Sequence, residues 1–322
     1  MFLQTIRLAT SAALLVLAGF YFLAPADPGG PSPLGAGAAS VLAAVVLWVP
    51  WRGLFITLLH HHYQNKRSLG KTLKNILVLL PALRFYHHDV RPPAHSTPTE
   101  NAIRLLALNA YEANRKVAPK AEFIQAQNHD IVAVSEVNSH WELALKSLGH
   151  AYPHQKLTTA QDSLKKYKML LLSKFPVKVV KKRANGRVVH YKVAAPHGEI
   201  YLIQVHPRAP LTPKRTETRN QTLKAIGDIK TDLPLIIMGD FNCVPWQKPV
   251  REIIEKQNLK LAGLPTPTYP ASQKINQHKQ IDVKPVSPLD YILMPAKAEL
   301  HTAETHRVPE TDHLAVSAVI NL

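Results

Sequence analysis

The sequence predicts an α/β domain in which β-sheets pack face to face and helices cover their outer sides. Short, mainly apolar segments with the length of buried strands recur between residues 103 and 320. Longer amphipathic segments lie between several of them, at 117–127, 140–148 and 212–230. Strands that occur in runs with helices between the runs are typical of sheets packed against each other with helices outside.

The individual elements follow from local patterns. The predicted strands are 103–108, 131–135, 169–172, 177–180, 188–193, 200–205, 235–238, 289–293 and 314–320. The predicted helices are 117–127, 140–148, 212–230 and 250–255. In the third helix, Leu223, Ile226 and Ile229 recur at a spacing that puts them on one face. Asn185-Gly186 predicts a hairpin turn between two of the strands.

The N-terminal residues 1–90 have a different composition and predict a membrane anchor. Ile6 to Ala24 and Ala38 to Leu59 are apolar and each approach the ~20 residues that a membrane-spanning helix needs. A signal peptide is the alternative for the first segment, but the second segment that follows favours a retained anchor. Residues 91–100 are rich in proline and polar residues and predict a linker. Residues 101–322 then form one domain of ordinary size.

A third apolar segment leaves the membrane topology open. Ile76 to Leu83 is short for a span and contains Pro81, so it either lies in the interface or crosses with its basic ends at the headgroups. The basic loop 60–74 is expected on the cytoplasmic side. Two spans would put the C-terminal domain in the cytoplasm, whereas three would put it outside.

The charge of the chain favours an anionic partner. The chain has 39 basic and 22 acidic residues, a formal net charge of +17. Ten of the basic residues, with no acidic residue between them, lie in the tract Lys165–Lys192. Nucleic acid, anionic lipid and a phosphorylated substrate are the partners that such a surface attracts. The alternative is a solvated edge hairpin on which lysines prevent aggregation.

Polar side chains occur at the boundaries of several predicted strands. They are Asn109, Glu136, His206, Asp240, Asn242, Asp290 and His313. A single Asn or Asp in such a place is readily explained as a cap or turn residue. Acids, amides and imidazoles at the ends of so many chain-distant strands are harder to explain that way. Hard oxygen ligands combined with histidine indicate metal-assisted hydrolysis.

Four motifs carry a resemblance to a known family. They are Val134-Ser135-Glu136-Val137, Gly239-Asp240-Phe241-Asn242, Leu289-Asp290-Tyr291 and Thr311-Asp312-His313. In this order they resemble the endonuclease/exonuclease/phosphatase superfamily, over roughly residues 103–320. The resemblance implies a four-layer α-β-β-α sandwich, with two packed mixed sheets between helices and the site at one end of the sheets. Val244-Pro245-Trp246 and the apolar N-terminus resemble a membrane-anchored bacterial branch, which implies a location in the bacterial inner membrane.

The resemblance also implies three groups of site residues. The group expected to bind Mg²⁺ or Mn²⁺ consists of Glu136, Asn109 and Asp312. The catalytic group consists of His313, Asp290, Asp240, Asn242 and His206. The substrate-binding group consists of Asn114 and Arg115. In these roles Asp240 and Asn242 position or deprotonate the attacking water, and Asp290 orients His313.

The expected function is therefore that of a membrane-anchored, divalent-metal-dependent phosphoesterase. Its substrate would be a phosphate monoester or diester, with a lipid-linked phosphate at the membrane surface as one candidate. A metal-dependent nuclease is the main alternative within the same chemistry. A catalytically silent, membrane-tethered binding module is the alternative from another class, although the complete set of reactive side chains argues against it. No protein partner is implied.

Overall fold

A computed structural model of the chain describes residues 101–161, 166–274 and 280–322. The predicted membrane anchor at 1–90 and the linker at 91–100 lie outside these described residues. Within the described ranges, no helix is both long and apolar enough to cross a membrane.

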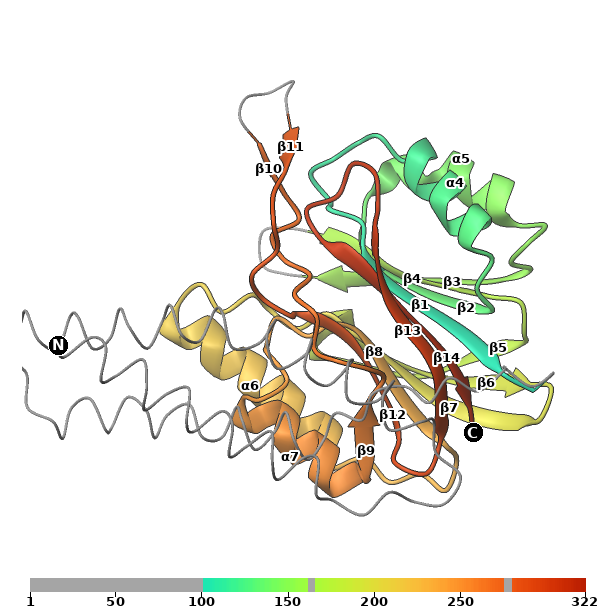
Figure 1. Ribbon diagram of the computed structural model, residues 1–322, viewed down its shortest axis with the longest axis vertical. Coiled ribbons are helices and arrows are strands. Elements are labelled where there is room, and N and C mark those ends of the chain that lie inside the picture. Colours follow the sequence, from blue (N-terminus) through green and yellow to red (C-terminus); the bar gives the residue numbers. More distant parts are fainter. Residues whose placement is uncertain (1–100, 162–165, 275–279) are drawn as a thin grey trace, which may run out of the picture. The chain divides into compact units, whose positions relative to one another are not determined.

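Two six-stranded mixed sheets form the centre of the domain (Figure 1). The first has the order β13-β14-β1-β2-β4-β3, with β1 (Ile103–Asn109), β2 (Ile131–Val137), β3 (His154–Gln161), β4 (Lys166–Ser173), β13 (Glu299–Arg307) and β14 (Leu314–Asn321). The second has the order β5-β6-β7-β8-β12-β9, with β5 (Val177–Arg183), β6 (Val188–Ala195), β7 (Gly198–Val205), β8 (Leu235–Asp240), β12 (Asp290–Pro295) and β9 (Leu259–Leu261). A separate short ribbon pairs β10 (Ser272–Lys274) with β11 (Gln280–Asp282).

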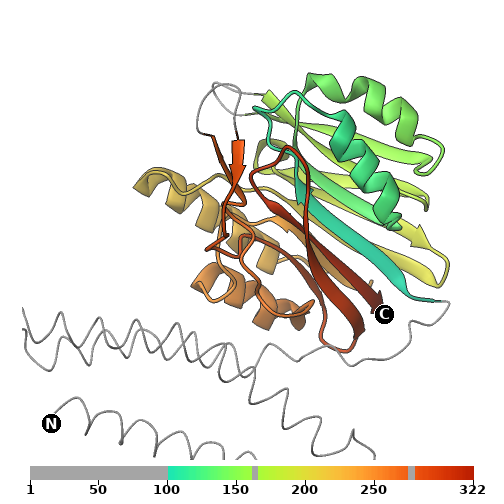
Figure 2. The same ribbon diagram turned by 45° about the horizontal axis from the view of Figure 1, so that its top comes forward.

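Helices cover the outer face of each sheet (Figures 1 and 2). The first sheet carries α4 (Ala118–Gln127) and α5 (Glu142–Leu148), and the second carries α6 (Pro213–Gly227) and α7 (Lys248–Gln257). The single-turn helices η1 (Ser139–Trp141) and η2 (Ala184–Gly186) lie in connections. The predicted arrangement of two packed mixed sheets flanked by helices is thus confirmed for the described residues.

Alternation of side chains along the strands creates the layers. In β1, Leu105 and Ala107 lie in the core between the two sheets, whereas Leu106 and Leu108 pack with Ile124 of α4 on the outer side. Successive strand residues point to opposite faces, so a central strand of this kind needs apolar residues at every position. This explains why the central strands are continuous apolar segments in the sequence.

Five strands are absent from the sequence prediction. Three of them, β3, β9 and β13, are edge strands of the two sheets, whereas β10 and β11 form the separate ribbon. The two edge strands of the first sheet, β3 and β13, read HQKLTTAQ and ELHTAETHR and are rich in polar residues. An edge strand needs less apolar burial and is usually protected by polar side chains, so periodicity alone does not reveal it.

Two strand–helix–strand units place the site. Both β1–α4–β2 and β7–α6–β8 connect neighbouring parallel strands through an outer helix. Parallel strands bring their carboxyl ends to the same edge of a sheet, where ligands of open α/β sheets bind. The antiparallel β12 and β14 begin at this edge, and Asp290 of β12 pairs with Asp240 of β8.

Candidate active site

At these strand ends, polar side chains of the two sheets contact one another. Asn109 Nδ2 donates a hydrogen bond of 3.2 Å to Asp240 Oδ2, across the two sheets. His206 Nε2 lies 3.4 Å from Glu136 Oε1 and 3.5 Å from Asp240 Oδ2. Side chains at the carboxyl ends of β1, β2, β7 and β8 therefore form one contiguous polar cluster, which we call the strand-end cluster.

His313 enters the cluster held by a carboxylate. Its Nδ1 donates a hydrogen bond of 2.7 Å to Asp290 Oδ2, and its Nε2 lies 4.0 Å from Asp240 Oδ2. Burial opposes the positive charge of the imidazole, but the carboxylates of Asp290 and Asp240 outweigh it and raise the pKa of His313 well above its ordinary value. His313 is therefore oriented as an imidazolium whose Nε2–H faces the cluster.

Thr268 fixes Asp290 and was not among the residues predicted from the sequence. Its hydroxyl donates a 2.7 Å hydrogen bond to Asp290 Oδ2 and accepts bonds of 3.1 Å from the backbone N–H groups of Leu289 and Asp290. Its neighbour Tyr269 lies against the imidazole of His313, with ring centroids 4.6 Å apart. Thr268 lies in a loop without a strand pattern, so no periodicity marks it.

Glu136 reaches the cluster through a distorted strand. The pairing of β2 with β4 shifts register between Val134 and Val137, and Glu136 has a left-handed φ of 58°. Such a bulge redirects a side chain at the end of a strand. Burial opposes ionisation of the carboxyl, but His206 and the backbone N–H of Glu112 outweigh it and lower the pKa of Glu136 to about 2. Glu136 is therefore an anion at every physiological pH.

Asp240 is buried more deeply and behaves differently. Burial, followed by the nearby negative charge of Asp290, raises the pKa of Asp240 above its ordinary value. Its Oδ1 accepts a 2.7 Å hydrogen bond from the backbone N–H of Asn242. The preceding Gly239 has a φ of 137°, and a Cβ atom there would lie 2.2 Å from the carbonyl oxygen of Val205. The glycine lets β8 approach β7 closely where the acid emerges.

The rest of the Gly239–Asn242 motif serves to hold Asp240 in place. Phe241 is fully buried and stacks on Tyr291, with ring centroids 4.0 Å apart. Asn242 donates from Nδ2 to the carbonyl oxygen of Pro207 at 3.1 Å. Its own carbonyl oxygen accepts a 2.7 Å hydrogen bond from the buried guanidinium of Arg219 on α6. Arg219 is a second supporting residue that the sequence does not reveal, since helical arginines are ordinarily surface residues.

The remaining predicted site residues are Asp312, Asn114 and Arg115. Asp312 is half-buried, and its pKa is raised by burial and by the carboxylate of Glu136, while His313 acts in the opposite direction. Asn114 donates a 2.8 Å hydrogen bond to Glu310, and Arg115 is exposed. The assignment of Asn114 and Arg115 to the substrate stays a prediction.

The donor set fits a divalent cation. Asp240, Asp290 and His313 could hold a metal ion, since one ligand atom from each lies within 4.8 Å of the others. Glu136 and Asp312 add two carboxylates whose charges act on the same groups. The buried Oδ1 of Asp290 has no hydrogen-bond partner among the described residues. Two of these crowded carboxylates have pKa values raised by burial and by mutual repulsion, and a cation stabilises such an environment.

The described residues form an α/β sandwich with the polar strand-end cluster at one edge of its sheets. A model of the Endonuclease/Exonuclease/phosphatase family matches residues 121–313, more than half of the chain. The chain belongs to this family, whose members are hydrolases that act on phosphoesters. A search of curated proteins finds no match to the chain.

Solved structures share the fold at low sequence identity. An endonuclease/exonuclease/phosphatase from Beutenbergia cavernae is 16% identical over 69% of this chain and 72% of its own, with a TM-score of 0.53. The human Nocturnin catalytic domain with bound sulfate is 18% identical over 72% of this chain and 99% of its own, with a TM-score of 0.51. D. rerio TDP2 complexed with a single-strand DNA product is 15% identical over 69% of this chain and 100% of its own, with a TM-score of 0.50. These likenesses establish the fold alone.

Proposed function

We propose that this protein hydrolyses a phosphate monoester or diester with the help of Mg²⁺ or Mn²⁺. The observation that carries the proposal is the convergence of His313, paired with Asp290, on the same Asp240 carboxylate that His206 and Asn109 contact. Residues that only capped helices or stabilised turns would form hydrogen bonds close to their own strands. They would not bring these distant segments into contact.

The metal is assigned to the side of the cluster that carries Glu136. Mg²⁺ prefers oxygen ligands, and Glu136 offers an ionised carboxylate, with Asn109 and Asp312 as further oxygen donors. His313 fits a metal less well, because its raised pKa keeps Nε2 protonated and a histidine must be neutral to bind a metal. When bound, the ion would act as a Lewis acid that neutralises a phosphoryl oxygen.

Different side chains would then carry out the separate proton transfers. Asp240 has a raised pKa and lies beside Asn242, so this pair suits the positioning and deprotonation of the attacking water. His313 is held as an imidazolium and can donate from Nε2 to a phosphoryl oxygen or to the leaving group. His206 lies between Glu136 and Asp240 and offers a second imidazole for a phosphate oxygen.

Hydrolysis of chromogenic esters by the full chain tests the proposal. The substrates are p-nitrophenyl phosphate as a monoester and bis(p-nitrophenyl) phosphate as a diester. We expect turnover only after Mg²⁺ or Mn²⁺ is added to the metal-stripped protein. His313→Ala should lower turnover at least ~10²-fold, because it removes a charge-stabilising donor.

A matched control separates this effect from general damage. His129→Ala removes another buried histidine, which lies just before β2 and so at the opposite end of that strand from Glu136. It should keep most of the activity. Activity that is indifferent to chelators, or a fully active His313→Ala variant, would sink the proposed mechanism. Absence of turnover of either ester with added metal would instead favour the catalytically silent binding module.

The substrate class is a second step of the proposal. A nuclease remains the main alternative, and the structural neighbours do not choose, because at their identities they establish the fold alone. A panel of DNA, RNA, phospholipids and prenyl pyrophosphates under one metal condition decides between them. Preference for a lipid-linked phosphate is the expected outcome if the enzyme acts at a membrane surface.

Membrane attachment through residues 1–90 is likewise part of the proposal and rests on the two long apolar segments of the sequence. Recovery of the full chain in the bacterial inner membrane, resistant to high salt and alkaline washes, is the expected result. Release by high salt alone would contradict an integral anchor. A reporter fused to the C-terminus would determine the side on which the catalytic domain lies.

A further inference from the structure

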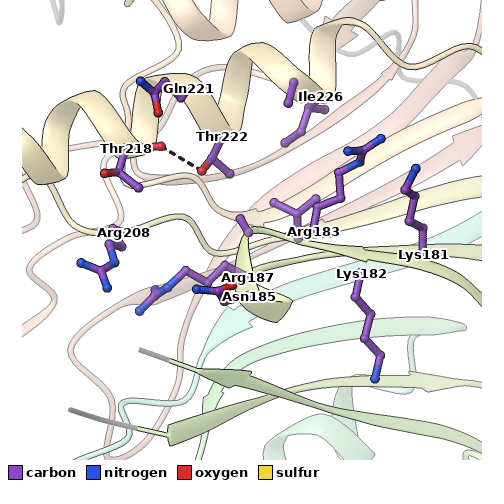
Figure 3. A pocket seen from close by; sticks show the side chains of 13 residues that line it. Lys181, Lys182, Arg183, Asn185, Arg187, Arg208, Thr218, Gln221, Thr222 and Ile226 are labelled. Carbon is purple, nitrogen blue, oxygen red and sulfur yellow. Dashed lines mark hydrogen bonds between the residues drawn. The ribbon is translucent and has the colours of Figure 1, made fainter. Parts of the chain in front are cut away.

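A cationic cavity lies beside the strand-end cluster and is not explained by the hydrolytic site. It has a volume of about 430 Å³ and lies between the end of the β5–β6 hairpin and helix α6 (Figure 3). This volume falls within the range of small-molecule sites, roughly 300–1,000 Å³. Its cationic lining residues are Lys181, Lys182, Arg183, Arg187 and Arg208.

The hairpin end is a fixed part of the fold. Ala184, Asn185 and Gly186 have left-handed φ angles of 49°, 57° and 84°. A Cβ atom at Gly186 would lie 2.3 Å from the carbonyl oxygen of Thr159 in β3, so the turn packs directly against the other sheet. The backbone that carries the flanking cations is therefore fixed against the other sheet, unlike that of a loosely packed edge hairpin.

The cavity and the strand-end cluster share a boundary at Arg187. The backbone N–H of His206 donates a 2.8 Å hydrogen bond to the carbonyl oxygen of Arg187. Arg187 Nη1 in turn donates to the carbonyl oxygen of His206 at 3.4 Å. Arg208 lines the cavity two residues after His206 in the sequence. The cavity therefore adjoins the backbone of His206, whose imidazole belongs to the strand-end cluster.

The residues that line the cavity favour an anionic ligand. None of the 13 lining residues is acidic. The hydroxyl groups of Thr218 and Thr222 already donate to helix carbonyls, so the lining side chains suited to donate to a ligand are the basic residues, Asn185 and Gln221. Figure 3 shows Lys181 and Arg183 extending toward α6, whereas Lys182 extends the other way. Planar guanidinium groups match the oxygens of a phosphate with paired hydrogen bonds.

We propose that this cavity binds a second phosphate group of the same substrate molecule whose scissile phosphate lies at the strand-end cluster. The inference rests on the proposed function and narrows it to substrates that carry at least two phosphate groups. Three features fit this role better than a charge that only improves solubility. They are the buried Arg187 between the cavity and the strand-end cluster, the fixed turn, and a lining without acidic residues.

Two chromogenic esters that differ by one phosphate test the substrate preference of the full chain. They are the p-nitrophenyl ester of thymidine 5′-phosphate and the same ester carrying a 3′-phosphate. We expect kcat/KM to be about tenfold higher for the second ester, since charge-assisted hydrogen bonds of one phosphate suffice for such a factor. The double variant Arg183→Gln/Arg208→Gln should lose this preference.

Lys178→Gln is the matched control. Lys178 is an exposed cation on the same strand, β5, outside the cavity lining. Its variant should keep the preference for the doubly phosphorylated ester. Equal kcat/KM for the two esters in the wild type would overturn the proposal, as would an equal loss of preference in Lys178→Gln and the double variant.

A binding measurement separates the cavity from the chemistry. Inorganic phosphate should raise the unfolding temperature of the metal-free full chain above that in chloride of equal ionic strength, because a ligand of the native state stabilises it. The double variant should lose this protection, whereas Lys178→Gln should keep it. If neither ester is hydrolysed, the proposed function fails and this protection still supports the anion site. Absence of protection in the wild type overturns the anion site itself.

Discussion

The two strand–helix–strand units of the molecule supply the site with acids in different ways. In β1–α4–β2, Ser135 pairs with Asn109 and is followed by Glu136. In β7–α6–β8, Gly239 pairs with Val205 and is followed by Asp240. The acid thus occupies the same place in both units, but the backbone departs from regular strand geometry at the acid in the first and at the preceding glycine in the second.

The two acids also differ in protonation. Glu136 keeps a pKa lowered to about 2, because contacts with His206 and a backbone N–H outweigh its burial. Asp240 has a raised pKa, because it is more deeply buried and faces Asp290. Carboxyl groups whose environments drive their pKa values apart have separate chemical roles. The two equivalent positions therefore carry acids of different character. Glu136 stays ionised and suits the binding of a metal cation, whereas Asp240 suits proton transfer as a base.

The largest expected effect separates these two roles. Glu136→Gln and Asp240→Asn should each lower turnover about 10³-fold at limiting Mn²⁺. Only Glu136→Gln should recover substantially when Mn²⁺ is raised, because it loses affinity for the metal, whereas Asp240→Asn lacks the base. Turnover as a function of Mn²⁺ concentration, with Mn²⁺ binding followed by electron paramagnetic resonance, measures this difference.

The opposite outcome would reverse the assignment. If Asp240→Asn weakens Mn²⁺ binding and Glu136→Gln does not, the metal lies with Asp240, Asp290 and His313, the group whose ligand atoms lie within 4.8 Å of one another.

The second effect concerns the backbone of the second unit. Gly239→Ala should destabilise the protein by about 3 kcal/mol, because the new Cβ would meet the Val205 carbonyl oxygen and the φ of 137° disfavours any side chain. Ser135→Ala at the equivalent position of the first unit is the control and should cost about 1 kcal/mol or less. Denaturant unfolding of both variants measures the difference, and equal losses would contradict the distinction between the units.

The sequence predicts only some of the features that distinguish the two units. The apolar central strands and the motifs at their ends are local signals, and they predict both the sandwich and the members of the cluster. The left-handed backbone of Glu136 depends on how β2 meets β4, and the support from Thr268 and Arg219 depends on contacts between distant segments. Edge strands such as β13 carry polar residues and resemble loops. Tertiary contacts of this kind leave no periodic pattern in the chain.

The third effect is a dependence of the rate on pH. Asp240 must be deprotonated to act as a base, so kcat/KM should fall as the pH drops through its raised pKa. Glu136, with a pKa of about 2, stays ionised through that range. The acid limb should therefore lie above the ordinary range of an aspartate and have a slope of one, about tenfold per pH unit. A slope of two would show that a second carboxyl titrates in this range, and Asp312, whose pKa is also raised, is one such group. Only a slope of two that persists in Asp312→Asn would show that Glu136 and Asp240 are less distinct than proposed.

The smallest effect isolates the backbone of the first unit. Glu136→Gly and Glu136→Ala both remove the carboxylate, so any difference in their stability comes from the main chain. Residue 136 has a φ of 58°, where an L side chain is disfavoured and glycine is not. We expect Glu136→Gly to be about 1 kcal/mol more stable than Glu136→Ala in denaturant unfolding, although glycine is the more flexible residue when unfolded. If the alanine variant is as stable as the glycine variant, the backbone bend at residue 136 causes no strain. The position of Glu136 would then depend only on the contacts of its side chain in the strand-end cluster.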